Sequence, residues 1–374
     1  MLEKDLLMFD EFFIQKQIKV FGAPLLLAVG TIGNLISFYI LFKNTRKAST
    51  YTYLSVLAIM DILVLYVGLL RVWLVQLGII VEDLNSVMCR LVTFLGYFCS
   101  DVSVWLIVIV TVERTIVVAL PLKAPSVCNS KYAKLGITSV ISIFFLLNLH
   151  FLWSMDLQYT VKNTTVTPEC KAIEGYTYLV EIIWPWVDAA FYSFTPFVII
   201  FVLNIIIIKN VINAKKARLV LRQQCSLSRP RAVKTQTHEH GEMSRRITCM
   251  LLAVSFTFLI TVLPMNILII RNSLIDNTET LKGLIRQRLL MTVAEMLMYT
   301  NHSINFFLYC ATGKKFRGQF RALAASCCRN TLELRLRRNM SQRSFNVSMP
   351  LVKMNSSRTD YVNCEQFFDK GVQL

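Results

Sequence analysis

Seven long apolar runs constrain the fold of this chain more than any other feature. They occupy residues 18–42, 51–78, 90–118, 133–155, 180–208, 246–271 and 289–311. A helix needs about 20 mostly apolar residues to cross a membrane, and each run is long enough. The runs are also too long and too uniformly apolar for barrel strands, whose residues alternate in character. The sequence therefore predicts an all-α membrane protein with a bundle of seven transmembrane helices.

Composition and charge agree with a membrane protein. Hydrophobic residues make up 55% of the chain, whereas soluble domains are usually about 45–50% apolar. The formal net charge of +17 would suggest nucleic-acid binding in a soluble protein. Here the Lys and Arg residues cluster between the apolar runs and in the tail, as expected at the cytoplasmic face of a membrane. We therefore expect lipid, and not nucleic acid, as a partner.

The basic residues of the connecting segments predict how the bundle is oriented. Lys43 and Arg46 follow the first run, and a dense basic group lies between Lys209 and Lys234 after the fifth run. These loops are predicted to be cytoplasmic, because cytoplasmic loops carry the excess of Lys and Arg. The first run is long enough to be retained as a signal anchor. An odd number of spans then places the amino terminus outside a multi-pass protein of the plasma membrane.

The segments that flank the runs complete the predicted organisation of the chain. Its parts are an extracellular terminus (1–17), the bundle (18–311), an amphipathic membrane-surface helix (312–328) and a disordered cytoplasmic tail (329–374). The polar, basic stretch 214–243 has no apolar periodicity and is predicted to be a loop.

The predicted membrane-surface helix has one apolar and one basic face. Phe316, Phe320 and Leu323 share the apolar face, and Lys and Arg lie opposite, a pattern typical of helices in the membrane interface. Cys327 and Cys328 follow directly. They are candidates for palmitoylation, with two unmodified thiols as the alternative.

Two cysteines are predicted to meet on the extracellular side. Cys89 precedes Arg114, at the far end of the third run, by 25 residues, or about 37 Å of helix. Cys170 lies in the extracellular segment between the fourth and fifth runs. That compartment is oxidising, so a Cys89–Cys170 disulfide is predicted, with two free thiols as the alternative. Asn163 in the same segment begins an N-glycosylation sequon.

Ionisable residues inside the apolar runs are candidates for function, because a charge inside a membrane is costly. Arg71 is ten residues after Asp61 and Glu295 is ten before Asn305, so both lie about 15 Å toward the outside. They either pair with each other or bind the charged ends of a peptide. Asp101 and Asp188 offer carboxylates to a basic group of a ligand. The full set is Asp61, Arg71, Asp101, Glu113, Arg114, Asp188 and Glu295.

Several short motifs lie in or beside the apolar runs. They are Gly33-Asn34, Leu57-Ala58-Ile59-Met60-Asp61, Glu113-Arg114-Thr115 with Pro121-Leu122, the prolines Pro196 and Pro264, and Asn305-Phe306-Phe307-Leu308-Tyr309. In their order and depths they resemble the motifs of rhodopsin-like (class A) G-protein-coupled receptors, over about residues 18–328. The last motif and Asn204 are similar to neuropeptide receptors of the FMRFamide-receptor group. Val262 and Phe306 depart from the family, which usually has Trp and Pro there.

This resemblance implies a cell-surface receptor that binds an extracellular peptide and activates a heterotrimeric G protein. Glu113, Arg114, Pro121 and Tyr309 would serve G-protein coupling, with Arg114 paired to Glu113 at rest. Arrestin and receptor kinases would bind the tail. Gly96 stands where amine receptors carry Asp, which argues against a monoamine ligand.

The resemblance also implies a polar pocket in the middle of the membrane. Asp61 would meet Asn34, Ser103, Asn301 and Asn305 there. With no cation among these residues, the pocket would hold a sodium ion, and the alternative is a plain hydrogen-bond network between helices.

A seven-helix transporter or channel is the main alternative function. Transporters tend to show repeats and helices broken by Gly or Pro, and the sequence displays neither pattern. An enzyme is not expected, because His150 and His302 sit in no recognisable catalytic motif. His302 is predicted to be a polar residue that is satisfied by packing. Apart from the sodium ion, no cofactor is expected.

Overall fold

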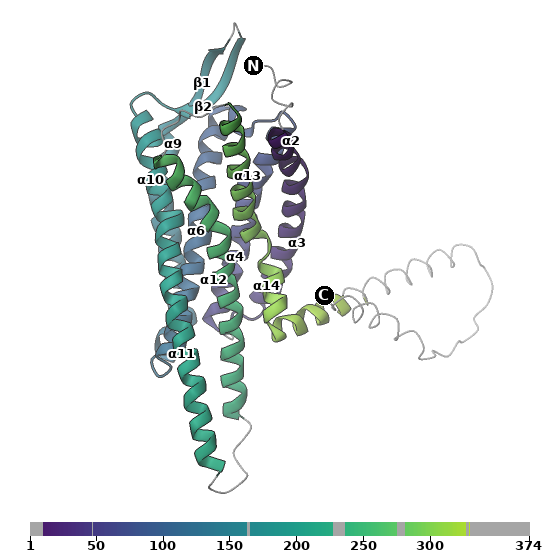
Figure 1. Ribbon diagram of the computed structural model, residues 1–374, viewed down its shortest axis with the longest axis vertical. Helices are drawn as coiled ribbons and strands as arrows, with labels where there is room; N and C mark the ends of the chain where they lie inside the picture. The colour runs from purple at the N-terminus through teal and green to yellow at the C-terminus, as the bar shows by residue number, and fades with distance from the viewer. Residues whose placement is uncertain are drawn as a thin grey trace, which may run out of the picture. The chain divides into compact units, whose positions relative to one another are not determined.

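A computed structural model describes residues 10–46, 48–162, 165–226, 236–274, 281–326 and 329. The chain divides into two compact units, Met1–Gly313 and Lys314–Leu374, and the first contains a bundle of long helices (Figure 1). The predicted modification sites Asn163, Cys327 and Cys328 and residues 330–374 of the tail lie outside the described residues.

The first two transmembrane helices each contain more than one helical segment, and the third is a single helix. The first consists of α2 (Asp10–Gln17), the π-turn η1 (Ile18–Gly22) and α3 (Ala23–Phe42). The second consists of α4 (Ser49–Val64), the π-turn η2 (Leu65–Leu69) and α5 (Leu70–Gln76). The short η3 (Val81–Asp83) leads to α6 (Ser86–Ala119). Asn85 caps α6, because its Oδ1 accepts a hydrogen bond from the Met88 backbone N–H at 2.8 Å.

The remaining helices follow a short α7 (Ala124–Val127). They are α8 (Ser130–Asn148), α9 (Phe151–Ser154), η4 (Tyr178–Ile183), α10 (Trp184–Asp188), η5 (Ala189–Phe194), α11 (Thr195–Ser226), α12 (Gln236–Leu274), α13 (Leu281–Ser303) and α14 (Asn305–Thr312). Within the described residues, six helices are long and apolar enough to cross a membrane, with mean hydropathies of 2.0 to 2.4. The seventh is divided between α13 and α14 at Ile304.

A two-stranded antiparallel hairpin lies between α9 and η4, at one end of the bundle (Figure 1). It consists of β1 (Met155–Lys162) and β2 (Thr165–Ala172), with Leu157 opposite Cys170. The predicted Cys89–Cys170 disulfide joins β2 to α6. We call this end of the bundle the hairpin end.

Helices extend beyond two of the predicted apolar runs. The helix that contains the first run begins at Asp10, and the stretch 214–243, predicted as a loop, is largely helical, because α11 continues to Ser226 and α12 begins at Gln236. Both segments are rich in Lys, Arg, Gln and Glu, which have good helix propensity without forming an apolar face. The absence of apolar periodicity therefore does not exclude a helix that leaves the membrane.

The second unit contains a helical segment over residues 314–326. This segment coincides with most of the predicted amphipathic helix. Its role as an eighth helix on a membrane surface stays a prediction.

Candidate functional site

A cavity of about 500 Å³ lies within the bundle. Its walls come from α4, η2, α5, α6, α10, η5, α12 and α13. Three charged residues, Arg71, Asp188 and Glu295, line it together with three tyrosines, Tyr97, Tyr192 and Tyr299. Ligand pockets in proteins typically measure about 300–1,000 Å³ and combine apolar walls with a few polar groups. This cavity is therefore large enough and polar enough to hold part of a ligand.

Arg71 and Glu295 line the same cavity, but their ion pairs are with other residues. Arg71 Nη1 lies 3.5 Å from Glu82 Oε1 in η3, and Glu295 Oε2 lies 3.9 Å from Lys19 Nζ in η1. The described part of the chain gives Asp188 no ion-pair partner. Of these three charged side chains, Asp188 is therefore the one whose charge is not balanced by an ion pair among the described residues.

Asp101 is not on the cavity, contrary to its prediction as a ligand-binding residue. Its side chain is 3% exposed, and its Oδ2 accepts a hydrogen bond from Asn148 Nδ2 of α8 at 2.9 Å. Thr93, Gly96, Tyr97 and Ser100 of α6 line the cavity. Each residue of a helix is rotated by about 100° from the one before it, so Asp101 points toward α8 instead.

Two glycines shape the cavity. A Cβ at Gly68 would lie 2.7 Å from Tyr299 Oη, so only glycine lets this ring pack against η2. At Gly96, by contrast, the nearest atom to a Cβ would be Val67 Cγ1 at 4.0 Å. Gly96 therefore leaves free space in the wall of the cavity and supplies no charge there.

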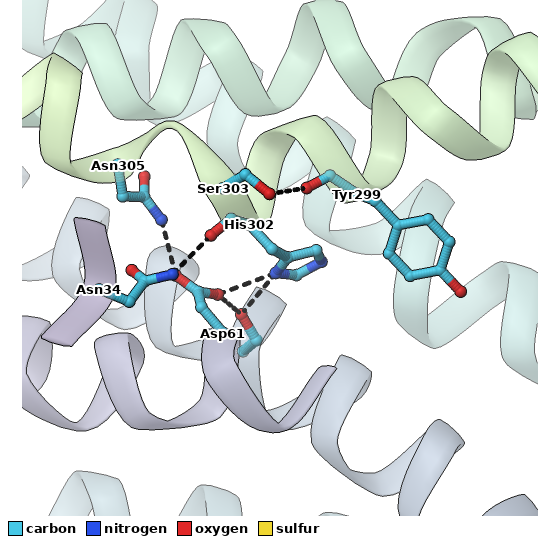
Figure 2. A network of polar contacts seen from close by, with 7 residues as sticks. Asn34, Asp61, Tyr299, His302, Ser303 and Asn305 are labelled. Atoms are coloured by element: carbon cyan, nitrogen blue, oxygen red, sulfur yellow. Dashed lines mark hydrogen bonds and ion pairs between the residues drawn. The ribbon is translucent and has the colours of Figure 1, made fainter. Parts of the chain in front are cut away.

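Below the cavity, Asp61 forms the centre of a buried polar network (Figure 2). Its Oδ1 accepts hydrogen bonds from Ser103 Oγ at 2.7 Å and from His302 Nδ1 at 2.8 Å. Its Oδ2 accepts from Asn305 Nδ2 at 2.7 Å. Asn34 Nδ2 donates to the His302 carbonyl at 2.8 Å. The network therefore links α3, α4, α6, α13 and α14.

The local sequence explains how α3 reaches this network. Gly33 allows a close approach, because a Cβ there would lie 3.0 Å from Phe306 Cβ. The neighbouring Asn34 can then reach the carbonyl of His302, just before the helix is interrupted at Ile304. The interruption occurs although Phe306 replaces the usual proline. A hydrogen bond from another helix stabilises the backbone at this point.

The described contacts place two of the predicted residues, Ser103 and Asn305, against Asp61. Asn34 instead donates to the His302 carbonyl, and Asn301 is buried on α13 and is not among the described hydrogen-bond donors to Asp61. His302 was predicted to be a satisfied polar packing residue, and its partner is Asp61 itself. The sequence alone did not place this basic side chain beside Asp61. A histidine one helical turn from Asn305 was the feature that could have revealed it.

The residues around Asp61 do not suit a sodium ion. Hard cations bind to oxygen atoms that offer lone pairs. Here Ser103, His302 and Asn305 turn an O–H or N–H group toward the carboxylate. Asn305 Oδ1 is buried with no hydrogen-bond partner among the described residues, but one neutral oxygen does not form a coordination shell. Hydrogen-bond donors therefore surround Asp61 at the place where a sodium ion was expected.

At the end of the bundle opposite the hairpin, Glu113 and Arg114 are buried side by side. Arg114 Nη2 lies 3.3 Å from Glu113 Oε1, and Thr50 Oγ1 of α4 donates a hydrogen bond to the same oxygen. The two charged side chains are 7% and 6% exposed. The sequence predicted the ion pair but not Thr50, which ties it to a second helix.

Pro121 and Tyr309, also predicted to serve coupling, differ in exposure. Tyr309 on α14 is 1% exposed. Pro121 is exposed, and its neighbour Leu122 is 95% exposed. Pro121 and Leu122 occupy a turn after α6. An apolar side chain so fully exposed at this end of the bundle is available to a partner protein.

The sequence matches the family described as 7 transmembrane receptor (rhodopsin family) over residues 33–309. The matched segment contains Gly33, Asn34, Asp61, the Glu113–Arg114 pair and Tyr309. It thus covers both the Asp61 network and the buried ion pair.

Individual relatives are similar over most of the chain. A probable G-protein coupled receptor of Caenorhabditis elegans is 25% identical over 311 residues, which cover 79% of this chain and 67% of the relative. The thyrotropin-releasing hormone receptor of Gallus gallus is 23% identical over 338 residues, with 85% and 82% covered. The FMRFamide receptor of Drosophila melanogaster is 24% identical over 306 residues, with 78% and 51% covered.

Proposed function

The chain belongs to the rhodopsin family of seven-transmembrane receptors, and on that premise we propose that it is a plasma-membrane receptor for an extracellular peptide. Agonist binding in the cavity activates a heterotrimeric G protein at the opposite end of the bundle. The hairpin end and the amino terminus face the outside. The family is one of receptors and not of enzymes.

The cavity with its three charged residues is the observation that carries this proposal. Asp188 lacks an ion-pair partner among the described residues, so it suits an ammonium or guanidinium group of the ligand. Arg71 keeps donors for a carbonyl, because its pair with Glu82 uses one guanidinium nitrogen at 3.5 Å. The tyrosines and Met265 suit an aromatic or apolar side chain. These features favour the end of a peptide in which a basic residue adjoins an apolar one.

The relatives support a peptide ligand in a second way. Two of them are named for thyrotropin-releasing hormone and for FMRFamide. Gly96 supports the same conclusion, because this wall of the cavity offers no carboxylate to a small amine. Amidated neuropeptides are therefore the first class of ligand to test.

The test is a screen of amidated peptides, each beside its free-acid form, on membranes from cells that express the receptor. Nucleotide exchange on added G proteins is measured together with ion flux across the same membranes. We expect one peptide class to stimulate exchange without flux. Flux that follows the peptide, with no exchange, would favour a channel or transporter instead.

Two aspartates provide a matched pair for the binding site. Asp188→Asn should weaken the active peptide about tenfold or more, because a charge-assisted hydrogen bond contributes about 1.5–3 kcal/mol. Asp101→Asn should leave peptide affinity within about twofold, since Asp101 faces Asn148 and not the cavity. Equal losses in the two variants would contradict this placement of the ligand.

Arg114 tests the coupling end of the proposal. Arg114→Ala should abolish peptide-stimulated nucleotide exchange and leave peptide affinity within about tenfold, because Arg114 is about 37 Å from the extracellular rim. A variant that loses affinity but keeps full exchange would contradict the assignment. Arrestin and receptor kinases are proposed to bind the tail, and the surface helix and its lipidated cysteines to bind the membrane.

A further inference from the structure

The contact between His302 and Asp61 places a basic ring where a carboxylate needs a positive charge. Asp61 is 1% exposed in the middle of the bundle, and His302 is 1% exposed. A carboxylate at this depth is costly unless it is paired, hydrated or protonated. Among the described residues, His302 is the basic group within ion-pair distance of Asp61.

The hydrogen bonds fix which atom of His302 faces Asp61. Nδ1 lies 2.8 Å from Asp61 Oδ1 and 3.3 Å from Ser103 Oγ. Ser103 itself donates to Asp61 Oδ1. With Asp61 as an ionised acceptor, the hydrogen between the ring and the carboxylate belongs to Nδ1. The ring also lines the cavity. His302 therefore connects the cavity to the carboxylate.

Arg71, Asp188 and Glu295 line the same cavity as His302, and the other titratable groups described near the pair are phenols. Tyr192 of η5 and Tyr299 of α13 line the cavity with His302, and Tyr309 of α14 interacts electrostatically with Asp61. Phenols are neutral near pH 7. Of the described carboxylates, Asp61 is the one within hydrogen-bond distance of the ring.

We propose that the His302 ring is the resident partner of Asp61 and occupies the place that a sodium ion would take. Its Nδ1–H donates to Asp61 Oδ1, and Ser103 and Asn305 complete the shell of donors. The proposal concerns the resting bundle and holds whatever ligand the receptor binds. It predicts a receptor whose resting state does not depend on sodium.

The experiment measures the Tm of purified full-length receptor in sodium chloride and in the chloride of a bulky organic cation, at matched ionic strength up to about 0.15 M. Sodium itself is the probe, so no agonist is needed. The wild-type Tm should be the same in the two salts. His302→Ser removes the ring and opens space beside Asp61, so its Tm should rise by about 2–4 °C with sodium. The double variant Asp61→Asn with His302→Ser should lose that rise.

His150→Ser is the matched control. His150 also lies in the bundle, where it packs against Phe151 and Trp184 with ring centroids 4.2 Å away from each, and it does not line the cavity. This variant should be as insensitive to sodium as the wild type. A wild-type Tm that rises with sodium would overturn the proposal. So would a His302→Ser variant that folds but gains no response to sodium, because Asp61 would then need no cation.

A second measurement keeps the proposal testable if His302→Ser does not fold. Replacing His150, His238 and His240 leaves His302 as the single histidine, whose ring can be labelled with ¹⁵N. At about pH 7 Nδ1 should give the signal of protonated nitrogen, because it donates to the carboxylate. An unprotonated Nδ1 would overturn the proposal.

Discussion

Two aspartates are buried in the bundle to almost the same degree, but they have very different neighbours. Asp61 is 1% exposed and Asp101 is 3% exposed. Asp61 accepts hydrogen bonds from α6, α13 and α14, whereas the described bond to Asp101 comes from Asn148 of α8. Burial makes both carboxylates costly. The number of helices that a carboxylate joins, and not its burial, distinguishes a group that can couple motions from one that holds a single contact.

The largest expected effect is the loss of Asp61. Asp61→Ala leaves the His302 ring without its acceptor and removes a bond from each of three helices, so we expect a loss of about 3–5 kcal/mol in the free energy of unfolding. Asp101→Ala removes a hydrogen-bond acceptor from Asn148 alone, so we expect a loss of about 1–3 kcal/mol in the free energy of unfolding. Denaturant or thermal unfolding of the two purified variants measures the difference. Equal losses would mean that the number of connected helices is irrelevant.

These two aspartates also show what the sequence predicts and what it does not. The depth of each carboxylate follows from its position in an apolar run, because a helix advances about 1.5 Å per residue. The direction in which a side chain points depends on how the helix is rotated against its neighbours, and apolar runs that face lipid and protein alike do not define that rotation. Asp101 was assigned to the ligand cavity for this reason.

His302 illustrates a second limit. Its contact with Asp61 depends on a break in the helix at Ile304, and the sequence has Phe306 where the family has the proline that would indicate such a break. The hairpin of β1 and β2 was also missed, because its eight-residue strands are short beside the apolar runs. The spans, the disulfide and the Glu113–Arg114 pair were predicted because apolar length and residue spacing suffice for them.

Glycine contacts test whether the Asp61 region is packed more tightly than the α6–α8 side. Gly33→Ala brings a Cβ within 3.0 Å of Phe306 Cβ, an atom that moves only with its backbone. We expect a cost of about 1–3 kcal/mol in unfolding free energy. Gly136→Ala on α8 meets Tyr53 Oη at 3.2 Å, the end of a side chain that can rotate away, and alanine favours the helix. Thermal unfolding should therefore show little change or a gain for Gly136→Ala. If Gly136→Ala destabilised the protein more than Gly33→Ala, the Asp61 region would not be the more tightly packed of the two.

A smaller effect is expected where α4 meets α6 at the opposite end of the bundle. Thr50→Val removes the hydrogen bond to Glu113, which holds the acceptor of Arg114 in place. A loss of about 1 kcal/mol should raise basal nucleotide exchange about fivefold. Thr115→Val is the control, because the Thr115 hydroxyl bonds within α6 to the Thr111 carbonyl at 2.9 Å. Its basal exchange should stay within about twofold, and a similar rise in both variants would contradict a specific role for Thr50.

The smallest effect is expected at Asp156, an aspartate of the hairpin that faces water. Hydrogen bonds from the Ser86 hydroxyl and the Leu157 backbone N–H, and then the Arg90 guanidinium, lower the pKa of Asp156 below its ordinary value of 3.8. Arg90 Nη2 lies 2.8 Å from Asp156 Oδ2. A lowered pKa means that the stabilisation is complete above the ordinary value and is lost as the pH falls through the lower folded value.

Exposed ion pairs contribute about 0.2–1 kcal/mol and are weakened by salt. Asp156→Asn should therefore make the hairpin amides exchange with deuterium slightly faster at neutral pH, by no more than about fivefold. The difference from wild type should shrink as the pH falls below about 4, where an ordinary Asp becomes protonated. High salt should reduce only the part of this exchange difference that comes from the Arg90 ion pair, because the hydrogen bonds from Ser86 and Leu157 act at short range and are not screened. A change as large as that of Asp61→Ala would show that an aspartate in water can matter as much as one that joins three helices, and the comparison would then fail.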